Sequence, residues 1–304
     1  MKIIYCNIFI IIVLLLSLNV HSSESEPKTP FRRQSCWSIG YNQFYNHRRS
    51  SYSPFDSIHS FKQHGYHGLL ALSGVLYLPL AGRPIAFFGK VDLGFGGGNN
   101  NDFDYDETVN DIKKFCEIYG DNALDKHRDI LLNNDYLFGL NMQKGGNHVT
   151  ISTGMELRLN KISHPWSADT VSFTNSKTIR FNIPLSVQLD RTFSTRLEIG
   201  IKLAVRFMVY GDYRGTSKHY IQSSSTVLTR NIATTPLENL PGAGIDIPIL
   251  VRTKQKFNMK FTPWFNYRPY NEGYFPFLPY NEARQSGYYE VRLFQTGLLV
   301  AIIF

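Results

Sequence analysis

The chain has 304 residues, of which 43% are hydrophobic, 14% aromatic and 18% charged, and its formal net charge is +8. This composition excludes a disordered chain and a domain too small to bury a core. Three cysteines in this length exclude a disulfide-built scaffold, and the positive charge alone does not separate nucleic acid from an anionic surface as partner.

The first 22 residues have the order of a secretion signal. Lys2 gives a positive start, Ile8 to Leu18 form an apolar run, and Ser22 closes a small-residue cleavage site. The apolar run is shorter than the roughly 20 residues that a membrane-spanning helix needs. We therefore predict that residues 1–22 are a removed signal peptide and not an anchor, followed by an N-terminal periplasmic segment at 23–35.

A period-two alternation of apolar and polar residues recurs along the rest of the chain, and it is clearest at 178–190. Such a period predicts a β-strand with one apolar and one polar face. In this stretch Ile179, Phe181, Ile183, Leu185, Val187 and Leu189 alternate with Thr178, Arg180, Asn182, Ser186, Gln188 and Asp190. Ten strands are predicted in this way, at 36–45, 66–80, 84–95, 135–143, 148–159, 177–189, 194–210, 244–255, 257–268 and 288–304.

The connections between these strands alternate between short and long. Tight turns are expected at 80–83, 144–147 and 190–193 and around Lys256. Long connections are expected at 46–65, 96–134, 160–176, 211–243 and 269–287. A soluble sandwich has no reason to make every second connection long, whereas outer-membrane barrels have short turns at one end and long loops at the other. The predicted fold is therefore all-β: a single closed antiparallel transmembrane β-barrel over 36–304, with about ten strands and eight or twelve as alternatives.

In such a barrel the apolar row faces lipid and the charged row faces the lumen. A ten-strand barrel is only a little wider than the eight-strand kind, which its own side chains fill. We therefore favour a salt-bridged plug, with a narrow pore that prefers anions as the alternative. Asp246, Lys254 and Arg292 belong to the same predicted row. The predicted lumen-lining residues are Lys90, Asp92, Glu156, Arg158, Arg180, Arg196, Glu198, Lys202, Arg206, Arg252, Lys260 and Arg268.

Prolines and aromatic residues give two further expectations. Pro184 and Pro248 lack a backbone donor and are expected at bulges. Aromatic residues near predicted strand ends are expected in interfacial girdles, or as ordinary strand aromatics. These residues are Trp37, Tyr41, Tyr45, Tyr136, Tyr210, Trp264, Tyr267 and Tyr289.

The last strand carries a resemblance to a known class of protein. The chain ends on Phe304, after the same-face residues Phe294, Thr296, Leu298, Val300 and Ile302. This ending resembles the C-terminal assembly signal of bacterial outer-membrane proteins. The repeated Ile-Pro-apolar segments at 183–187 and 247–251 look like the PorT-like group of outer-membrane barrels. The resemblance implies a bacterial outer-membrane location, with membrane lipid and the outer-membrane assembly machinery as partners.

The loop sequence GGGNNNDFDYDE at 96–107 is the strongest candidate for chemistry. Its Asp102 and Asp104 are similar to the Asp-x-Asp of omptin proteases, whose catalytic partner is an Asp-x-His in the fourth long loop. Here His219 has a comparable place, but Ser217 stands where the second Asp is expected, so the base lacks its orienting acid. Asp106 extends the acidic alternation, but the turn Gly and distal Glu of a calcium loop are missing, so no metal and no cofactor is predicted.

The remaining motifs suggest surface roles. The basic pairs in FRRQ (31–34) and HRRS (47–50) are expected near lipid head groups, where lipopolysaccharide phosphates are a candidate partner. Residues 107–120 have helical apolar spacing and are expected to form a short helix at the rim. Nucleic acid is excluded as a partner because the basic residues alternate into a lumen. The predicted function is a non-enzymatic outer-membrane barrel, acting as a narrow pore or as a surface-binding or assembly protein, with an omptin-like endopeptidase as the alternative.

Overall fold

The computed structural model describes residues 33–52, 59–105, 127–163, 174–221, 224–233, 241–253, 257–273 and 288–304. Every regular element in these ranges is a β-strand. Within them, no helix is long and apolar enough to cross a membrane. The predicted signal peptide and the predicted rim helix at 107–120 lie outside the described residues.

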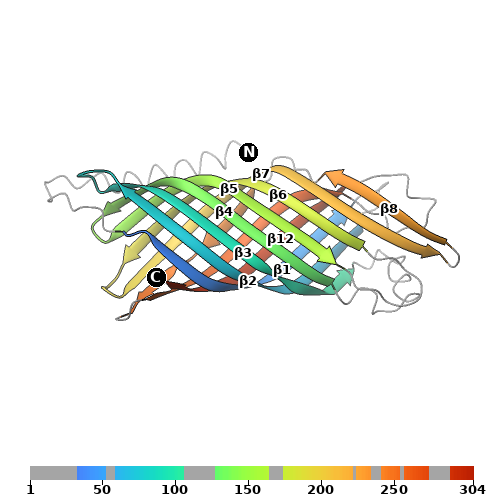
Figure 1. Cartoon of the computed structure of the whole chain (residues 1–304), viewed down its shortest axis with the longest axis horizontal. Coiled ribbons are helices and arrows are strands. Elements are labelled where there is room, and N and C mark those ends of the chain that lie inside the picture. Colours follow the sequence, from blue (N-terminus) through green and yellow to red (C-terminus); the bar gives the residue numbers. More distant parts are fainter. Residues whose placement is uncertain are drawn as a thin grey trace.

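The strands form one antiparallel sheet that closes on itself (Figure 1). Consecutive strands pair from β1 to β7, β11 pairs with β12, and β12 pairs with β1. The barrel closes because β9 and β10, one after the other, each pair with both β7 and β11. The strands are β1 (Cys36–Tyr52), β2 (His59–Pro79), β3 (Ile85–Tyr105), β4 (His127–Lys144), β5 (Asn147–Ser163), β6 (Thr174–Thr192), β7 (Leu197–Ile221), β8 (Ser224–Ala233), β9 (Gly242–Asp246), β10 (Ile249–Arg252), β11 (Asn258–Gly273) and β12 (Tyr288–Ile303).

The prediction of an all-β closed antiparallel barrel with ten strands is confirmed, because β9 and β10 share one position in the wall and β8 is an addition to it. The predicted strand at 244–255 is broken into β9 and β10. The hairpin of β7 and β8 occupies part of 211–243, which was expected to be a loop. Strand pairing also continues past several predicted ends: β3 reaches Tyr105 and β4 begins at His127, inside the predicted loop 96–134.

Both strand prolines coincide with interruptions of the hydrogen-bond ladder, as a residue without an N–H requires. The β5–β6 pairing is interrupted at Pro184, opposite Gly154. Gly154 has a φ of 156°, and a Cβ there would lie 1.9 Å from the Tyr136 carbonyl oxygen, so only glycine fits. Pro248 separates β9 from β10. Neither proline lies at the expected bulge: the β5–β6 pairing keeps the same register on both sides of Pro184, and the register shift of β6 lies at Phe181/Asn182 against β7. Pro248 lies at a strand break.

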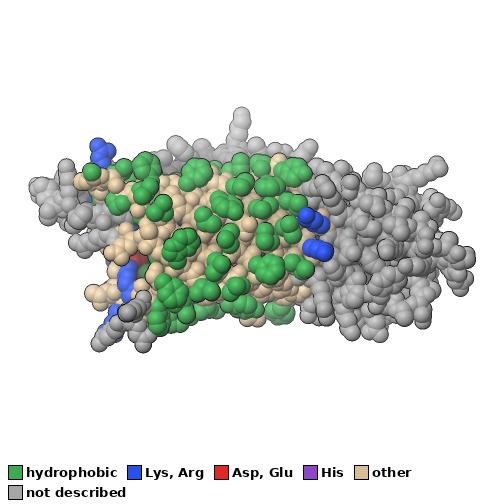
Figure 2. Space-filling model, viewed as in Figure 1, with side chains coloured by type: hydrophobic (Ala, Val, Ile, Leu, Met, Phe, Trp, Pro, Cys, Tyr) green, Lys and Arg blue, Asp and Glu red, His purple; other side chains and the backbone are tan. Residues whose placement is uncertain are grey.

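The outer face of the barrel reverses the burial pattern of a soluble protein. In β6, Ile183 and Leu185 are 42% and 51% exposed, whereas Asn182 and Ser186 are buried. Figure 2 shows the apolar side chains as a continuous band, with the Lys and Arg side chains of this view at its two edges. Lipid hydrocarbon covers a band of this kind. Its members include Ile39, Leu70, Leu72, Leu76, Phe87, Phe95, Phe138, Leu140, Ile151, Met155, Ile183, Leu185, Ile201, Leu203, Ile245, Phe265 and Leu298.

The two ends of the barrel differ in how the strands are joined. We call one the short-turn end, because the connections 80–84, 145–146 and 193–196 lie there together with the C-terminus, at the left of Figure 1. We call the other the long-connection end; the β7–β8 hairpin lies there, at the right of Figure 1. The predicted alternation of short and long connections therefore corresponds to two opposite ends of one barrel.

Candidate functional site

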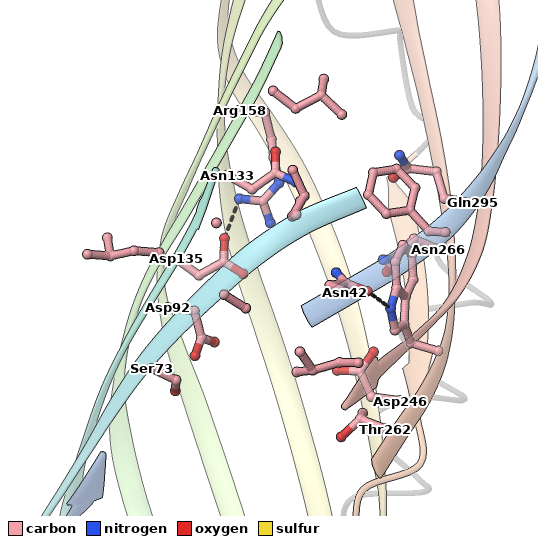
Figure 3. A pocket seen from close by; sticks show the side chains of 18 of the residues that line it. Asn42, Ser73, Asp92, Asn133, Asp135, Arg158, Asp246, Thr262, Asn266 and Gln295 are labelled. Atoms are coloured by element: carbon pink, nitrogen blue, oxygen red, sulfur yellow. Dashed lines mark hydrogen bonds and ion pairs between the residues drawn. The ribbon is translucent and has the colours of Figure 1, made fainter. Parts of the chain in front are cut away.

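The lumen contains a cavity of about 250 Å³. In Figure 3, Asp92, Asp135 and Arg158 lie on one side of it, and Asn42 and Asp246 lie on the other. Its lining comes from the residues that alternate with the apolar outer row. The uncharged polar members of the lining are Ser38, Asn42, Asn46, Ser73, Asn133, Asn160, Gln188, Thr262, Asn266 and Gln295.

Glu156 on β5 is the centre of an ion-pair cluster that crosses the lumen. Its side chain is 3% exposed, and its Oε1 accepts a hydrogen bond from Arg206 Nε at 2.7 Å. Its Oε2 lies 3.3 Å from Arg158 Nη2 and 3.3 Å from Arg268 Nη2. Arg158 also pairs with Asp135 on β4. Arg206 lies on β7, two strands from β5, and Arg268 lies on β11 across the lumen, so these ion pairs join separate parts of the wall.

A second ion-pair cluster fills the lumen at the short-turn end. Arg33, which precedes β1, places Nη2 2.8 Å from Asp190 Oδ2, pairs with Glu198, and donates from Nη1 to the Tyr77 hydroxyl at 3.3 Å. Arg252 Nη2 lies 2.7 Å from the other carboxylate oxygen of Glu198. Burial lowers the pKa of the Arg33 guanidinium, but the neighbouring carboxylates, Asp190 first, hold it above its ordinary value, so the group stays charged.

Three lysines line the cavity between these clusters. Lys90 Nζ lies 2.5 Å from Asp92, and Lys202 Nζ lies 3.6 Å from Asp246. Lys260 makes no ion pair with the described part of the chain, and the strongest charge acting on it is that of Lys90. This layer of the lumen therefore has more ammonium groups than carboxylates.

Apolar side chains fill another part of the lumen. Phe44, Leu69 and Leu131 form a buried cluster against Trp264, and all four line the cavity. Trp264 Nε1 donates a hydrogen bond to Asn42 Oδ1 at 2.9 Å. The cavity is therefore bounded by apolar as well as charged side chains.

A second apolar cluster contains Tyr270, Val291 and Leu293, with Met208 packed against it. The Arg180 guanidinium lies over the Tyr270 ring, 4.2 Å from its centroid. Such a cation–π contact compensates a charge without a carboxylate. The cluster joins β6, β7, β11 and β12 inside the barrel.

The structure places most of the predicted lumen residues around the lumen, in three groups. Glu156 is buried behind the cavity, and Glu198 and Arg252 belong to the short-turn cluster. Arg196 lies instead in the turn between β6 and β7 and is exposed, because β7 begins only at Leu197. The residues that line the cavity are Lys90, Asp92, Arg158, Arg180, Lys202, Arg206, Asp246, Lys260 and Arg268.

Two further expectations are wrong about which face of the strand a residue occupies. Arg292 shares its face with Leu298 and Ile302, so it lies on the outside, exposed and 2.7 Å from Glu290. Trp264, which was expected in an interfacial girdle, lies in the lumen, because it alternates with the outward Phe265. Lys254 lies outside the described residues. Of the other described girdle candidates, Trp37, Tyr41, Tyr136 and Tyr210 are exposed on the outer face, whereas Tyr45 and Tyr267 are half-buried.

The residues of the peptidase alternative occupy strands and not loops. Asp102 and Asp104 lie in β3, opposite His64 and Lys62 of β2. His219 lies in β7, opposite a residue of β8. Strands β4, β5 and β6 separate β3 from β7 along the wall, so the backbone does not make the acids and the histidine neighbours within the sheet. Asp106 and the side chains of the other three lie outside the described part of the structure.

Several residues of the lumen site were missed from the sequence. Arg33 was assigned to a periplasmic segment and a lipid-facing basic pair, yet its side chain enters the barrel. Arg48 of the second pair lines the cavity, so only Arg49 of that pair is exposed. Asp135 lies in a predicted strand whose parity would have placed it inside. Asp190 was correctly assigned to the polar row of its strand. Its pairing with Arg33 could not be predicted, because Arg33 precedes the first strand and is not part of any alternating pattern.

No protein-family model matches the chain, and no curated protein matches it in sequence. Among solved structures, it is similar to the outer membrane protease OmpT from Escherichia coli, with 6% identity over 89% of this chain and 95% of that chain and a TM-score of 0.49. It is also similar to a major outer membrane protein from Thermus thermophilus, with 10% identity over 90% of this chain and 100% of that chain and a TM-score of 0.38. A third similar structure is the translocator domain of the autotransporter NalP from Neisseria meningitidis. The identity is 9% over 88% of this chain and 89% of that chain, and the TM-score is 0.33. At these identities and scores the similarities carry no inference about activity, which is argued below from the chain's own geometry.

Proposed function

We propose that this chain is an integral β-barrel of a bacterial outer membrane that is non-enzymatic, has a lumen closed by side chains, and acts in binding or assembly at its long-connection end. The observation that carries the proposal is the pair of ion-pair clusters. Glu156 joins β5 to β7 and, across the lumen, to β11, and Arg33 joins Asp190 and Glu198 at the short-turn end. Two such layers around a small cavity favour a plug over an open channel.

The location rests on the two faces of the wall. Backbone polar groups must be paired in hydrocarbon, and a closed barrel is the strand arrangement that achieves this. The apolar outer band and the charged interior agree with that requirement. The signal-like order of residues 1–22 supports export, and the alternating apolar residues of β12 support recognition by an outer-membrane assembly machinery. The likeness to the PorT-like group adds a candidate relationship within this class.

The β7–β8 hairpin supports a binding role for the long-connection end. Among the described strands, β8 forms ladder pairs with β7 alone. A strand with one unpaired edge is a template on which another strand can add. A partner that binds through an extended segment therefore fits this end of the barrel.

The outer rim supports an anionic lipid partner, for which lipopolysaccharide is the candidate. Lys161 on β5 and Lys177 on β6 are directly opposite each other and exposed at the long-connection edge of the apolar band. Arg49 and Arg292 form a second such pair on β1 and β12. Like charges directly opposite each other destabilise a sheet, and lipid phosphates would compensate them.

Planar bilayers test the closed lumen. We expect the wild-type barrel to give no steady conductance, and the Glu156→Gln and Arg33→Ala variants to give frequent open steps. Steady ohmic current through the wild-type protein would contradict the proposal.

The cavity favours a second candidate, a narrow pore that prefers anions, because its lining has an excess of basic groups. In a salt gradient across the bilayer, the sign of the reversal potential would then report anion selectivity. A cation-selective current would exclude this second candidate.

Cleavage of basic-site peptides tests the peptidase alternative. The purified barrel, in detergent with lipopolysaccharide, is expected to leave such peptides intact. Cleavage by the wild-type protein that is lost in both Asp102→Asn and Asp104→Asn would overturn the non-enzymatic assignment.

A further inference from the structure

Among the described residues, the charges around the lumen cavity do not balance. Apart from Arg48, seven basic side chains line the cavity against three carboxylates, and Glu156 behind them adds a fourth carboxylate. A lumen surrounded by lipid has a lower dielectric constant than water, so uncompensated like charges repel one another strongly there. The seven basic residues are Lys90, Arg158, Arg180, Lys202, Arg206, Lys260 and Arg268, and the acidic residues are Asp92, Asp135 and Asp246.

Several of the basic groups have donors without an acceptor in the described part of the chain. Arg206 is 7% exposed, and its Nη1 makes no hydrogen bond. The same is true of Arg180 Nη1 and Arg268 Nε. Lys260 has no ion pair with the described residues. Acceptors of the same lumen, among them Asn160 Oδ1 and Asn266 Oδ1, also lack a partner among the described residues. Because buried polar groups are normally satisfied, these donors and acceptors together indicate a polar occupant of the cavity, and the excess of basic groups favours an anion with its water.

Gly244 of β9 leaves room for the Arg206 guanidinium and the Asn266 amide beside the cavity. A Cβ on Gly244 of β9 would lie 2.2 Å from Arg206 Nη1 and 2.3 Å from Asn266 Oδ1, so a larger residue would displace both groups. The cavity, at about 250 Å³, is smaller than the roughly 300–1,000 Å³ of sites for drug-sized ligands. It has the volume of on the order of eight water molecules. An occupant is therefore a small ion with some of its water.

We propose that this cavity binds a small oxyanion with two or more negative charges, such as inorganic phosphate or a short dicarboxylate. Guanidinium groups bind such oxygens through directed N–H donors, and lysines add point charge. A single chloride would balance only one charge and would use few of the fixed donors. The inference goes beyond the proposed function, since it requires neither conductance nor a partner at the long-connection end.

Trp264 provides a reporter for binding, because its ring lines the cavity. The chain has three tryptophans; Trp37 is 73% exposed on the outer face, and Trp166 lies outside the described residues. In a Trp37→Phe/Trp166→Phe background, the emission comes from Trp264 alone. Titration of the folded barrel in detergent with phosphate or succinate should change this emission saturably and raise the unfolding temperature. Sodium chloride at matched ionic strength should do neither.

Lys260→Gln tests the site with little risk to the fold, because removal of an ammonium without an ion pair leaves no carboxylate unpaired. We expect this change to weaken binding about tenfold or more, the usual range for loss of a charge-assisted contact. Arg83→Gln, in an exposed turn at the short-turn end, also removes one positive charge and should leave the affinity unchanged. Circular dichroism and heat-modified gel mobility establish that each variant is folded.

The proposal is overturned if neither phosphate nor succinate gives a saturable change, or if chloride gives the same change at matched ionic strength. It is also overturned if Lys260→Gln binds as tightly as the wild-type barrel. Binding of one of the two anions with dependence on Lys260 supports the site and identifies phosphate or carboxylate as the preferred group. Because the readout is emission and not current or partner binding, failure here is distinguishable from failure of the proposed function.

Discussion

The outer wall and the lumen of this barrel are made by the same strands, yet their residues contribute to stability in different ways. On β6, Leu185 faces outward and needs only an apolar surrounding, whereas its neighbour Ser186 faces inward and shares a hydrogen bond with Ser152, with 2.8 Å between the hydroxyl oxygens. Each outward residue therefore contributes to stability independently of the others, through the apolar surface area that it exposes to lipid. Inward residues act through specific partners on other strands.

Two glutamates show the difference directly, since each is paired with arginine. Glu156 is buried in the lumen with Arg158, Arg206 and Arg268 around it. Glu290 lies on the outer face, where it pairs with the exposed Arg292 at 2.7 Å. An ion pair removed from water depends on its geometry, whereas an exposed one is screened and contributes little. The same residue type should thus have very different effects in the two places.

The largest expected effect is that of Glu156→Gln. The change removes the carboxylate shared by three guanidinium groups, of which Arg158 alone keeps a second partner, Asp135. Breaking a buried pair in this way costs about 3–5 kcal/mol. Glu290→Gln is the matched control and should cost less than about 1 kcal/mol. Urea unfolding of the barrel in detergent, followed by tryptophan emission, measures both values. Equal losses for the two variants would show that the lumen cluster is hydrated like the surface.

The next largest loss in the free energy of unfolding is expected when a charge is placed on the outer wall. Leu185 lies in the middle of the apolar run at 179–189, so Leu185→Arg is expected to reduce the free energy of unfolding by about 2–4 kcal/mol in lipid. Leu78 is equally exposed but lies at the end of β2, at the short-turn edge, where the cost of Leu78→Arg should fall to about 0–1 kcal/mol. Unfolding in vesicles compares the two variants. A loss at Leu185 no larger than that at Leu78 would contradict a lipid-facing wall.

The wall was more predictable from the sequence than the lumen for a physical reason. A lipid-facing row needs only period two, which is visible along 178–190, and ten strands and their faces follow from it. A lumen partner is chosen by three-dimensional proximity, which no local pattern contains. Parity therefore located Glu156 and Arg206 inside the barrel but did not reveal that they bond to each other.

The errors have the same origin. Arg33 precedes the first strand, so no alternation indicated that its side chain turns back to Asp190. Arg196 alternates with apolar residues as an inward residue of a strand would. It lies in the turn before β7, however, and the alternation alone does not show where the strand begins. The β7–β8 hairpin was missed because its sequence is polar on both faces, as expected for strands that extend beyond lipid.

Arg33→Ala is expected to have an intermediate effect. Arg33 is mostly buried and hydrogen-bonded to charged groups, contacts that contribute about 1.5–3 kcal/mol. Its loss leaves Asp190 without this partner, while Glu198 keeps Arg252. Arg83→Ala removes an exposed arginine of a short turn at the same end and should be neutral. Urea unfolding compares them, and a neutral Arg33→Ala would show that the segment before β1 does not hold the short-turn end together.

The smallest effect on the barrel itself is expected at its outer rim. Lys161 and Lys177 face each other across β5 and β6, so replacing both by glutamine removes a like-charge repulsion and should leave the free energy of unfolding in detergent unchanged or slightly higher. If lipid phosphates compensate the pair, binding of lipopolysaccharide should weaken by about fivefold for each lysine, since a basic residue near an anionic surface contributes about 1 kcal/mol.

Lys144→Gln, an exposed change at the short-turn end, is the control for general charge and should not alter lipopolysaccharide binding. Co-purified lipopolysaccharide and vesicle flotation measure the difference. An equal loss in Lys144→Gln would mean that the protein attracts anionic lipid by net charge alone. A loss confined to the Lys161 and Lys177 variants would assign the lipid contact to one edge of the wall, and would show that the wall, like the lumen, has a place where specific partners matter.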